Sequence, residues 1–130
     1  MTDLSVCTTL RMPARAMSGA FDAALAPCSM HASHFAILHA INAAEENGVA
    51  LSRLAEMVVL DRTSLYRALG PIQRSGWLTV APAPKGRAKV ATLSALGHEV
   101  HDTAAASWES MKRRALEAYG SERWAKVQPA

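Results

Sequence analysis

The chain has 130 residues, half of them apolar, which is enough for one domain with one modest hydrophobic core and excludes a disordered tail. Its net charge of +3 is small, and no run of about 18 apolar residues occurs that could span a membrane. Because the N-terminal residues also lack the basic-then-apolar order of a secretory signal peptide, we expect a cytoplasmic protein.

A first helix is predicted over residues 5–27 and a second over about residues 32–46. Pro13 interrupts the first: either the regular helix starts near Met12, with Pro13 at a tolerated first position, or it kinks there. Ala26-Pro27 ends the first helix and Asn47-Gly48 the second. The side chains expected to face inward are Leu10, Met17, Phe21, Ala24 and Leu25 on the first helix and Phe35, Leu38, Ile41 and Asn42 on the second.

Residues 51–77 predict two short helices joined by a tight turn. The first should run from Ser52, a suitable N-cap, to about Val59. The second should run from about residue 62 to 75, with the Asp61 carboxylate favouring its N-terminus. Apolar residues spaced as on one helix face are Leu51, Leu54, Ala55 and Val58 in the first and Leu65, Ala68, Leu69 and Ile72 in the second.

The opposite face of the second helix is polar. It carries Thr63, Arg67, Gly70 and Arg74, with Ser64 and Tyr66 beside them. A hydroxyl, two guanidiniums and a small gap suit a base edge and two phosphates better than a hydrophobic core. Pro71 lacks the N–H that would bond the Arg67 carbonyl and should bend or loosen the last turn, which Gly76 closes.

A β-hairpin with a basic tip is predicted directly after this helix pair. Residues 77–82 and 88–93 read as strands, and the turn between them contains Lys85 and Arg87. Residues 61–90 together carry six basic side chains against one aspartate, a net charge of +5. Such a run is often only a solvated face, but it is also typical of a phosphate-binding surface. The order of elements is that of a winged helix, whose tip can reach a minor groove or the backbone.

A long helix is expected from its N-cap Ser94 to about Tyr119. At roughly 1.5 Å per residue it exceeds about 35 Å, so a core this small cannot cover it, and its surplus apolar face, which includes Trp108, suggests a partner chain. Gly120 should break it before a short last helix anchored by Trp124 and Val127. We predict a mainly α fold in one domain, residues 1–130: a DNA-binding core and wing at 31–93, and dimerisation helices at 5–27 and 94–130.

The chain resembles the MarR family of winged helix-turn-helix regulators. The resemblance is carried by LSRLAEMVVLDRTSLYRALGPIQRSGWL (51–78), by VATLSALGHEV (90–100), and by Cys7, Arg11, Arg15, Asp22 and LAP (25–27) near the N-terminus. It implies a homodimer with interleaved first and last helices that binds a pseudo-palindromic operator. Many such proteins are repressors released by small phenolic or aromatic carboxylate ligands.

The resemblance also assigns roles to residues. Arg62, Thr63, Ser64, Tyr66 and Arg67 match recognition-helix contacts, and Arg87 matches the wing-tip arginine. Three departures stand out: Lys85-Gly86 replaces an acidic residue that usually precedes the wing arginines, Pro13 interrupts the first helix, and the last helix is short. The residues predicted to contact DNA are Arg62, Thr63, Ser64, Tyr66, Arg67, Arg74, Lys85 and Arg87. The alternative for Arg67 is a surface arginine in a local ion pair.

Other side chains have a possible role and a plain alternative. Cys7, near a helix N-terminus, is a candidate redox thiol or a small buried or interfacial side chain. The i, i+3 pairs His31/His34 and His98/His101 have a spacing that zinc uses, but we favour interface or solvent positions and predict no metal site. Candidate groups for binding an effector carboxylate are Arg11, Arg15, His31 and His34, although Arg15 could instead hold a structural ion pair.

We therefore expect a homodimeric regulator that binds double-stranded DNA and acts as a ligand- or redox-responsive repressor. The alternative is a winged helix used for protein–protein contact. No nucleophile elbow, phosphate loop or metal motif indicates an enzyme, and no cofactor is expected.

Overall fold

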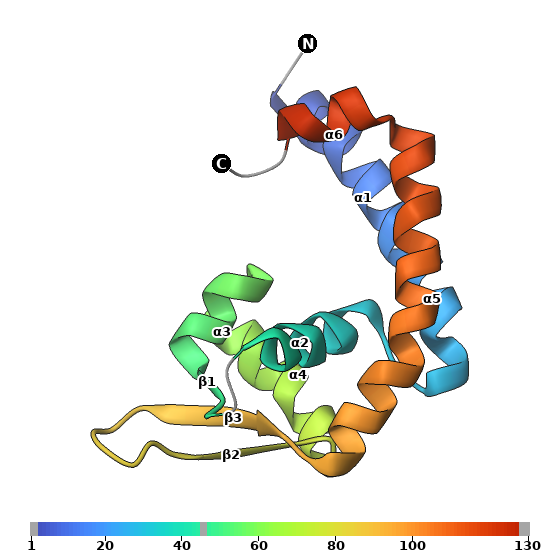
Figure 1. Cartoon of the computed structure of the whole chain (residues 1–130). Coiled ribbons are helices and arrows are strands. Elements are labelled where there is room, and N and C mark those ends of the chain that lie inside the picture. Colours follow the sequence, from blue (N-terminus) through green and yellow to red (C-terminus); the bar gives the residue numbers. More distant parts are fainter. Residues whose placement is uncertain (1–2, 45–46, 128–130) are drawn as a thin grey trace.

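The computed structural model describes residues 3–44 and 47–127 and is mainly helical (Figure 1). Its elements, in chain order, are α1 (Asp3–Leu25), a short 3-10 helix (Ala26–Cys28), α2 (Ala32–Ala43), β1 (Val49–Ala50), α3 (Leu51–Val58), α4 (Arg62–Arg74), β2 (Leu78–Pro82), β3 (Lys89–Leu93), α5 (Ala95–Tyr119) and α6 (Ser121–Val127). None of the described helices is long and apolar enough to cross a membrane. The predicted fold class, a winged helix-turn-helix with helical extensions, is confirmed.

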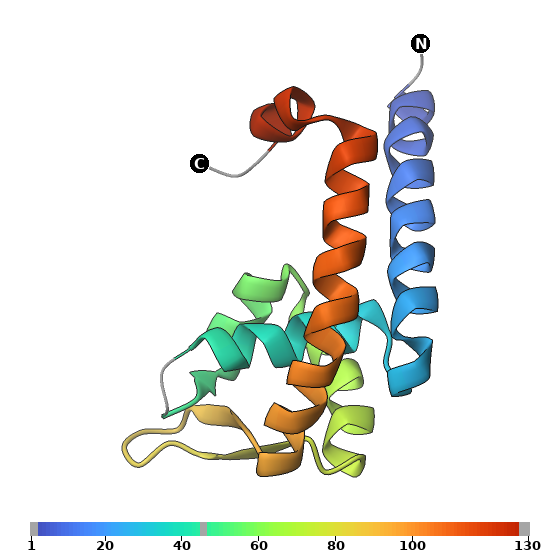
Figure 2. The ribbon, with the colours of Figure 1, turned by 45° about the vertical axis from the view of Figure 1, so that its right-hand side comes forward.

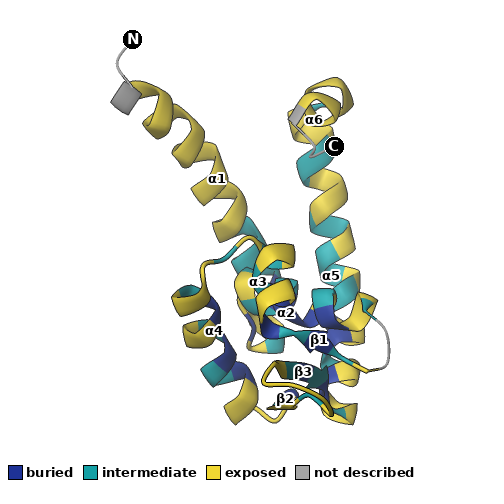
Figure 3. Ribbon diagram, turned by 90° about the vertical axis from the view of Figure 1, so that its left-hand side faces the viewer, coloured by how far each residue is buried: buried dark blue, intermediate teal, exposed yellow. Residues whose placement is uncertain are grey.

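The elements form two parts, which we call the body and the arm. The body contains α2, α3, α4, the three strands and the start of α5; the arm contains α1, the rest of α5 and α6 (Figure 1). In the arm, α1 packs on α5 near the body, the two helices diverge toward their far ends, and α6 folds back from the end of α5 (Figure 2, Figure 3). Because α5 belongs to both parts, it is a continuous connection between them.

The sheet has three antiparallel strands in the order β1-β3-β2. Strands β2 and β3 form the predicted hairpin, with Leu78 opposite Leu93 and Pro82 opposite Lys89. Strand β1 pairs with the other edge of β3, Val49 opposite Ala91. The sequence analysis missed β1, because two residues are too short to show the alternation by which strands are recognised.

The core lies where α2, α3, α4 and β3 meet. The predicted inward faces of the body helices are confirmed: Phe35, Leu38, Ile41, Leu51, Leu54, Leu65, Leu69 and Ile72 are buried. Asn42 was wrongly placed among them; it is exposed, and its side chain bonds His98 on α5. On the arm only Leu25 of the predicted α1 stripe is fully buried, while Leu10 and Met17 are exposed and Phe21 and Ala24 are half-buried.

Several helix boundaries differ from prediction. Helix α1 begins at Asp3 and continues through Pro13, so a start near Met12 is wrong (Figure 2). Helix α2 ends at Ala43 with Ala44 as its C-cap, while the predicted end falls on residues 45–46, outside the described ones. Ser52 is not the N-cap of α3, because the chain leaves β1 directly into the helix and Ala50 takes that position.

The end of α4 follows the prediction in part. Pro71 lies inside the helix, which continues to Arg74, and the Ser75 N–H donates to the Pro71 carbonyl over 3.0 Å. Gly76 then adopts a φ of +77°, which only glycine adopts without strain, and turns the chain into β2.

The start of α5 is fixed by one tight contact. Ser94 caps the helix as predicted, accepting the Gly97 N–H over 2.9 Å, and its hydroxyl donates to the Gly76 carbonyl over 2.6 Å. Gly97 is buried against Trp77: a Cβ placed on Gly97 would lie 1.8 Å from the Trp77 carbonyl oxygen. Only a residue without a side chain allows α5 to begin this close to the end of α4.

We therefore expect Gly97→Ala to destabilise the protein by about 1–3 kcal/mol, because the backbone must move to relieve an overpacked contact. Chemical denaturation followed by circular dichroism measures this loss. The control is Gly70→Ala on α4, where the nearest atom to a new Cβ is the flexible Arg74 guanidinium at 3.2 Å and the better helix propensity of alanine helps. Equal stability of the Gly97→Ala variant and the native chain would contradict this assignment.

Candidate nucleic-acid interface

Helix α4 packs on the core through one face and is capped at its N-terminus. Leu65, Leu69 and Ile72 are buried in the body, so the opposite face of the helix turns outward (Figure 3). Asp61 is its N-cap: one carboxylate oxygen accepts the Ser64 N–H over 2.7 Å and the other accepts the Ser64 hydroxyl over 3.1 Å. These bonds, with smaller effects from the Thr63 backbone and the Arg67 charge, hold the pKa of Asp61 below its usual value.

The outward face of α4 is polar and cationic, as predicted. Thr63, Tyr66, Arg67 and Arg74 are exposed, and none of these side chains forms an ion pair with a described residue. The alternative that a local ion pair holds Arg67 therefore finds no support. Ser64 is half-buried and its hydroxyl is engaged with Asp61, which gives this residue a capping role that the sequence analysis did not identify.

The gap expected at Gly70 is filled. A Cβ on Gly70 would lie 3.2 Å from Nη1 of Arg74, so the Arg74 side chain runs back along α4 and covers the glycine. Since Gly70 lies on the same face as Arg67, this conformation moves the second guanidinium toward the first. The space above Gly70 is thus occupied by the Arg74 guanidinium and is not open.

A hollow of about 290 Å³ separates the start of α4 from the wing. Its polar lining comes from Ser52, Arg62, Tyr66, Arg87 and Lys89, and no acidic residue lines it. The Arg62 guanidinium carbon lies 5.7 Å from the centre of the Tyr66 ring, a cation–π distance, so these two side chains are in contact at the edge of the hollow. The structure therefore brings Arg62, Tyr66 and Arg87 together, and adds Lys89, which the sequence analysis counted only as part of the basic segment.

The wing is a narrow hairpin closed by the Ala83 N–H, which donates to the Ala88 carbonyl over 2.8 Å. Lys85 and Arg87 are exposed at its end, on either side of Gly86, whose φ is +89°. Among the described residues no carboxylate pairs with either cation. The described residues therefore provide no acidic neighbour that would orient the wing arginine.

The candidate effector residues are not all brought together. His31 and His34 meet at the start of α2, with ring centroids 5.3 Å apart, and the Asp22 carboxylate accepts the Ala32 N–H over 2.7 Å. Burial first, and then His31, lowers the pKa of His34, with Asp22 opposing. Arg11 and Arg15 are exposed on α1, and Arg15 forms no ion pair with the part of the chain that the structure describes.

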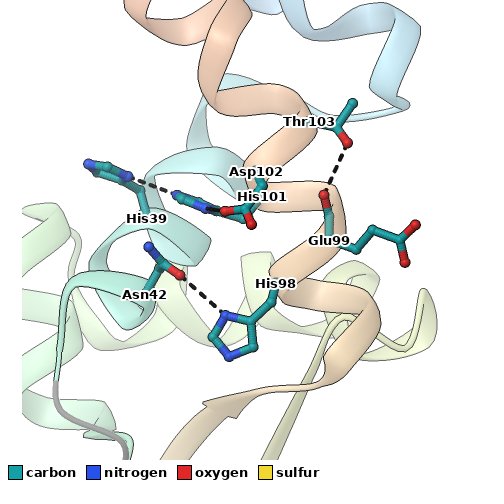
Figure 4. A network of polar contacts seen from close by, with 7 residues as sticks. All are labelled: His39, Asn42, His98, Glu99, His101, Asp102 and Thr103. Atoms are coloured by element: carbon teal, nitrogen blue, oxygen red, sulfur yellow. Dashed lines mark hydrogen bonds and ion pairs between the residues drawn. The ribbon is translucent and has the colours of Figure 1, made fainter.

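The other sequence candidates lie apart. Cys7 is exposed on α1 and Cys28 is half-buried in the 3-10 helix, and both thiols are free. His98 and His101 do not face one another: each bonds a different residue of α2 (Figure 4). Within residues 3–44 and 47–127 no group of three or more histidine, cysteine or acidic side chains could hold a metal ion.

The sequence matches no protein-family model and no curated protein sequence. The structure is similar to solved transcriptional regulators over most of its length. Mycobacterium tuberculosis MosR, solved in complex with DNA, is 29% identical with a TM-score of 0.75, covering 88% of this chain and 80% of that one. A second structure of MosR gives 28% identity, a TM-score of 0.81, and coverage of 96% and 88%.

Two further regulators share the fold at lower identity. AbsC, a MarR-family transcriptional regulator from Streptomyces coelicolor, is 18% identical with a TM-score of 0.83, covering 98% of this chain and 88% of that one. CouR from Rhodococcus jostii RHA1, solved bound to p-coumaroyl-CoA, is 17% identical with a TM-score of 0.78, covering 94% and 85%. The predicted resemblance is therefore confirmed in the fold.

The cap of α4 generates a prediction about the outward face. We expect Asp61→Ala to lower the melting temperature and to fray the first turn of α4, whereas Asp61→Asn, which keeps a capping oxygen, should stay close to the native chain. Because the folded-state pKa of Asp61 is lowered, its contribution is present above its ordinary value of 3.8 and lost as the pH falls through the folded value. The difference in melting temperature between the native chain and Asp61→Ala should thus shrink in acid, and a constant difference would contradict this role.

Proposed function

From the winged helix-turn-helix fold that this chain shares with the MarR-family transcriptional regulators, we propose that it is a homodimeric regulator of transcription that binds double-stranded DNA. The observation that carries the proposal is the outward face of α4, where exposed guanidiniums form no ion pair with a described residue; the one carboxylate that feels the Arg67 charge, Asp61, is engaged in capping the helix. A basic face on the second helix of such a pair is the part that enters a major groove. The DNA complex of the similar MosR supports this use of the fold.

Each basic group then has a role. Arg67, exposed on α4, bonds a guanine edge or clamps a phosphate, and Arg74, lying over Gly70, contacts the neighbouring phosphate. Arg87 at the wing reaches the adjacent minor groove or backbone, with Lys85 near it. Arg62 and Tyr66 line the hollow between helix and wing, and Thr63 is exposed beside Arg62 at the start of α4. Ser64 keeps the start of the helix in place through Asp61.

The exposed apolar side chains of the arm support the proposed homodimer. Leu10 is 68% exposed on α1, Trp124 is 40% exposed on α6, and almost the whole surface of α1 is open (Figure 3). Apolar side chains spread along two helices that leave the body have no cover in one chain, and a second copy would remove them from water. A twofold dimer would place two α4 helices about 34 Å apart, as successive major grooves of a pseudo-palindromic operator require.

Control by a small molecule or an oxidant completes the proposal, with repression as the simplest mode. The similar regulator CouR holds p-coumaroyl-CoA, which supports an aromatic or phenolic effector for this chain as well. Arg11, Arg15, His31 and His34 remain its candidate contacts, and Cys7, exposed on α1, is open to an oxidant. Either event would act by favouring one of two dimer geometries.

Removal of Arg67 tests the DNA contact. Duplexes selected from a random pool by the native chain should bind Arg67→Ala about 10- to 100-fold more weakly, since a bidentate contact to a base contributes about 1–3 kcal/mol. A fluorescence titration measures both affinities, and Arg53→Ala, which removes an exposed arginine of α3 that pairs with Glu56 and belongs to neither the proposed contacts nor the arm, should bind like the native chain. Native-like binding by Arg67→Ala would refute its role. A native chain without salt-dependent duplex affinity would instead favour the protein–protein alternative.

The arm is tested by molecular mass in solution. We expect a native mass of about twice the 13.9 kDa of one chain, and Leu10→Glu should shift it toward one chain because a carboxylate would be buried in the interface. Sedimentation velocity distinguishes the two species. Val59→Glu is the matched control, since Val59 is an 87% exposed apolar residue in the turn between α3 and α4, away from the arm. A monomeric native chain would refute the dimer.

A further inference from the structure

A lysine continues the inward face of β3. Along this strand Ala91 and Leu93 are buried, and they belong to the face that turns toward the helices of the body. Because successive side chains of a strand alternate between its two faces, Lys89 belongs to the same face as Ala91 and Leu93. It is exposed, and its side chain lines the hollow between α4 and the wing. A position that continues an inward face suits an apolar residue, so a cation there needs a function.

Strand pairing fixes where this lysine lies. Pro82 of β2 pairs with Lys89 on one side of β3. On the other side Ala50 of β1 pairs with Val90, the next residue, and α3 starts at Leu51 directly after β1. Lys89 is therefore held by the backbone of the sheet at the base of the wing, beside the start of α3.

Cations from α4 and from the wing meet at the hollow, which holds about 290 Å³. Arg62 comes from α4, and Arg87 and Lys89 come from the wing. None of the three forms an ion pair with a described residue, and no acidic residue of the described ranges lines the hollow. Asp61 precedes Arg62 in the chain, but both of its carboxylate oxygens accept from Ser64. The hollow is therefore a cationic site without a counter-ion, which favours an anion.

The rest of the lining suits a phosphodiester. The hydroxyls of Ser52 and Tyr66 add hydrogen-bond donors, and an arginine in a cation–π contact, as Arg62 makes with Tyr66, can still donate its N–H groups to phosphate oxygens. Leu51 and Leu65 contribute apolar surface to the same hollow. A phosphodiester matches both parts, because its oxygens meet the cations while the carbons of its sugars cover the apolar surface. Inorganic phosphate would leave that apolar surface uncovered.

We propose that this hollow binds one phosphate of the DNA backbone in each protomer, and that the Lys89 ammonium is a principal contact to it. The inference rests on the proposed function, in which α4 enters a major groove and the wing reaches the neighbouring minor groove. The backbone that separates these two grooves has to pass between α4 and the wing, where the hollow lies. Lys89 then fixes the position of α4 along the duplex without reading a base.

The salt dependence of duplex binding tests Lys89 first. Lys89→Gln should lower the slope of log affinity against log salt concentration by about 0.9 for each protomer bound, and weaken binding by about 3- to 10-fold per protomer at about 0.1 M salt. The loss should be equal for a duplex selected by the native chain and for a shuffled one, because a phosphate carries no base sequence. A native slope in Lys89→Gln overturns the proposal.

Two further variants serve as controls for this titration. Lys89→Arg keeps the charge and should retain the native slope. Arg53→Gln removes an exposed cation of α3 that pairs with Glu56 and does not line the hollow, so it should also retain the native slope. A slope lowered equally by Arg53→Gln and Lys89→Gln would show a general effect of net charge and would overturn the proposal.

Neutral phosphates then locate the contact on the duplex. A methylphosphonate, in which a methyl group replaces one charged oxygen, is placed at each backbone position of the selected duplex in turn. At one position in each half-site, the native chain should lose as much affinity as Lys89→Gln loses on the unmodified duplex. At that position Lys89→Gln should lose less than about twofold more, since the interaction is already absent. Losses that add at every position overturn the proposal.

Inorganic phosphate distinguishes a free anion from the DNA backbone. Titrated into the native chain without DNA and followed by NMR, it should give no saturable shift of the Tyr66 ring. A saturable shift that Lys89→Gln abolishes, combined with a native salt slope in Lys89→Gln, would make the hollow a site for a free anion and overturn its assignment to DNA. A native chain that binds no duplex refutes the proposed function and this assignment together. A native chain that binds duplex as tightly as Lys89→Gln refutes only this inference.

Discussion

The burial of one side of α4 determines how the rest of this chain is used. Leu65, Leu69 and Ile72 lie on the core at almost zero exposure, so the helix cannot rotate without exposing three large apolar side chains to water. Each of them contributes about 1.5–3 kcal/mol when fully buried, far more than any surface contact on the opposite side could offset. Arg67 and Arg74 therefore face outward because of what lies beneath them and not through any contact of their own.

The burial of one face of a helix is a local feature that a sequence makes predictable. The apolar spacing of α4, the caps at Asp61 and Ser94, and the break at Gly120 each depend on residues within one turn, and all of them agree with the structure. Ser52 failed as a cap for a nonlocal reason: pairing of β1 with β3 brings the chain straight into α3 and makes Ala50 the first position. A two-residue strand can be recognised only from the strand that it pairs with, which here lies about forty residues later in the chain.

The candidate site was likewise predictable where it depends on spacing within one helix, and not where it depends on contacts between elements. Spacing alone placed the guanidiniums on one face of α4, but it does not fix the side-chain conformation that lays Arg74 over Gly70. The convergence of Arg62, Arg87 and Lys89 on one hollow depends on how the wing folds back. The histidines show the limit most clearly. Sequence spacing paired His98 with His101, whereas the packing of α2 on α5 gives each its own partner, and His39 lies 62 residues from His101 in the chain.

The position of the histidine contact follows from the same helix that forms the arm. In the first turn of helix α5, Gly97 lies against the Trp77 carbonyl, where no side chain fits, and this end of the helix is fixed in the body. One turn later His101 bonds His39, and two turns beyond that Trp108 packs against both Phe35 and Phe21. A long helix fixed at one end transmits a small change near that end as a larger displacement at the other. The contacts between the fixed start of α5 and α2 therefore have more influence on the direction of the arm than contacts farther along the helix.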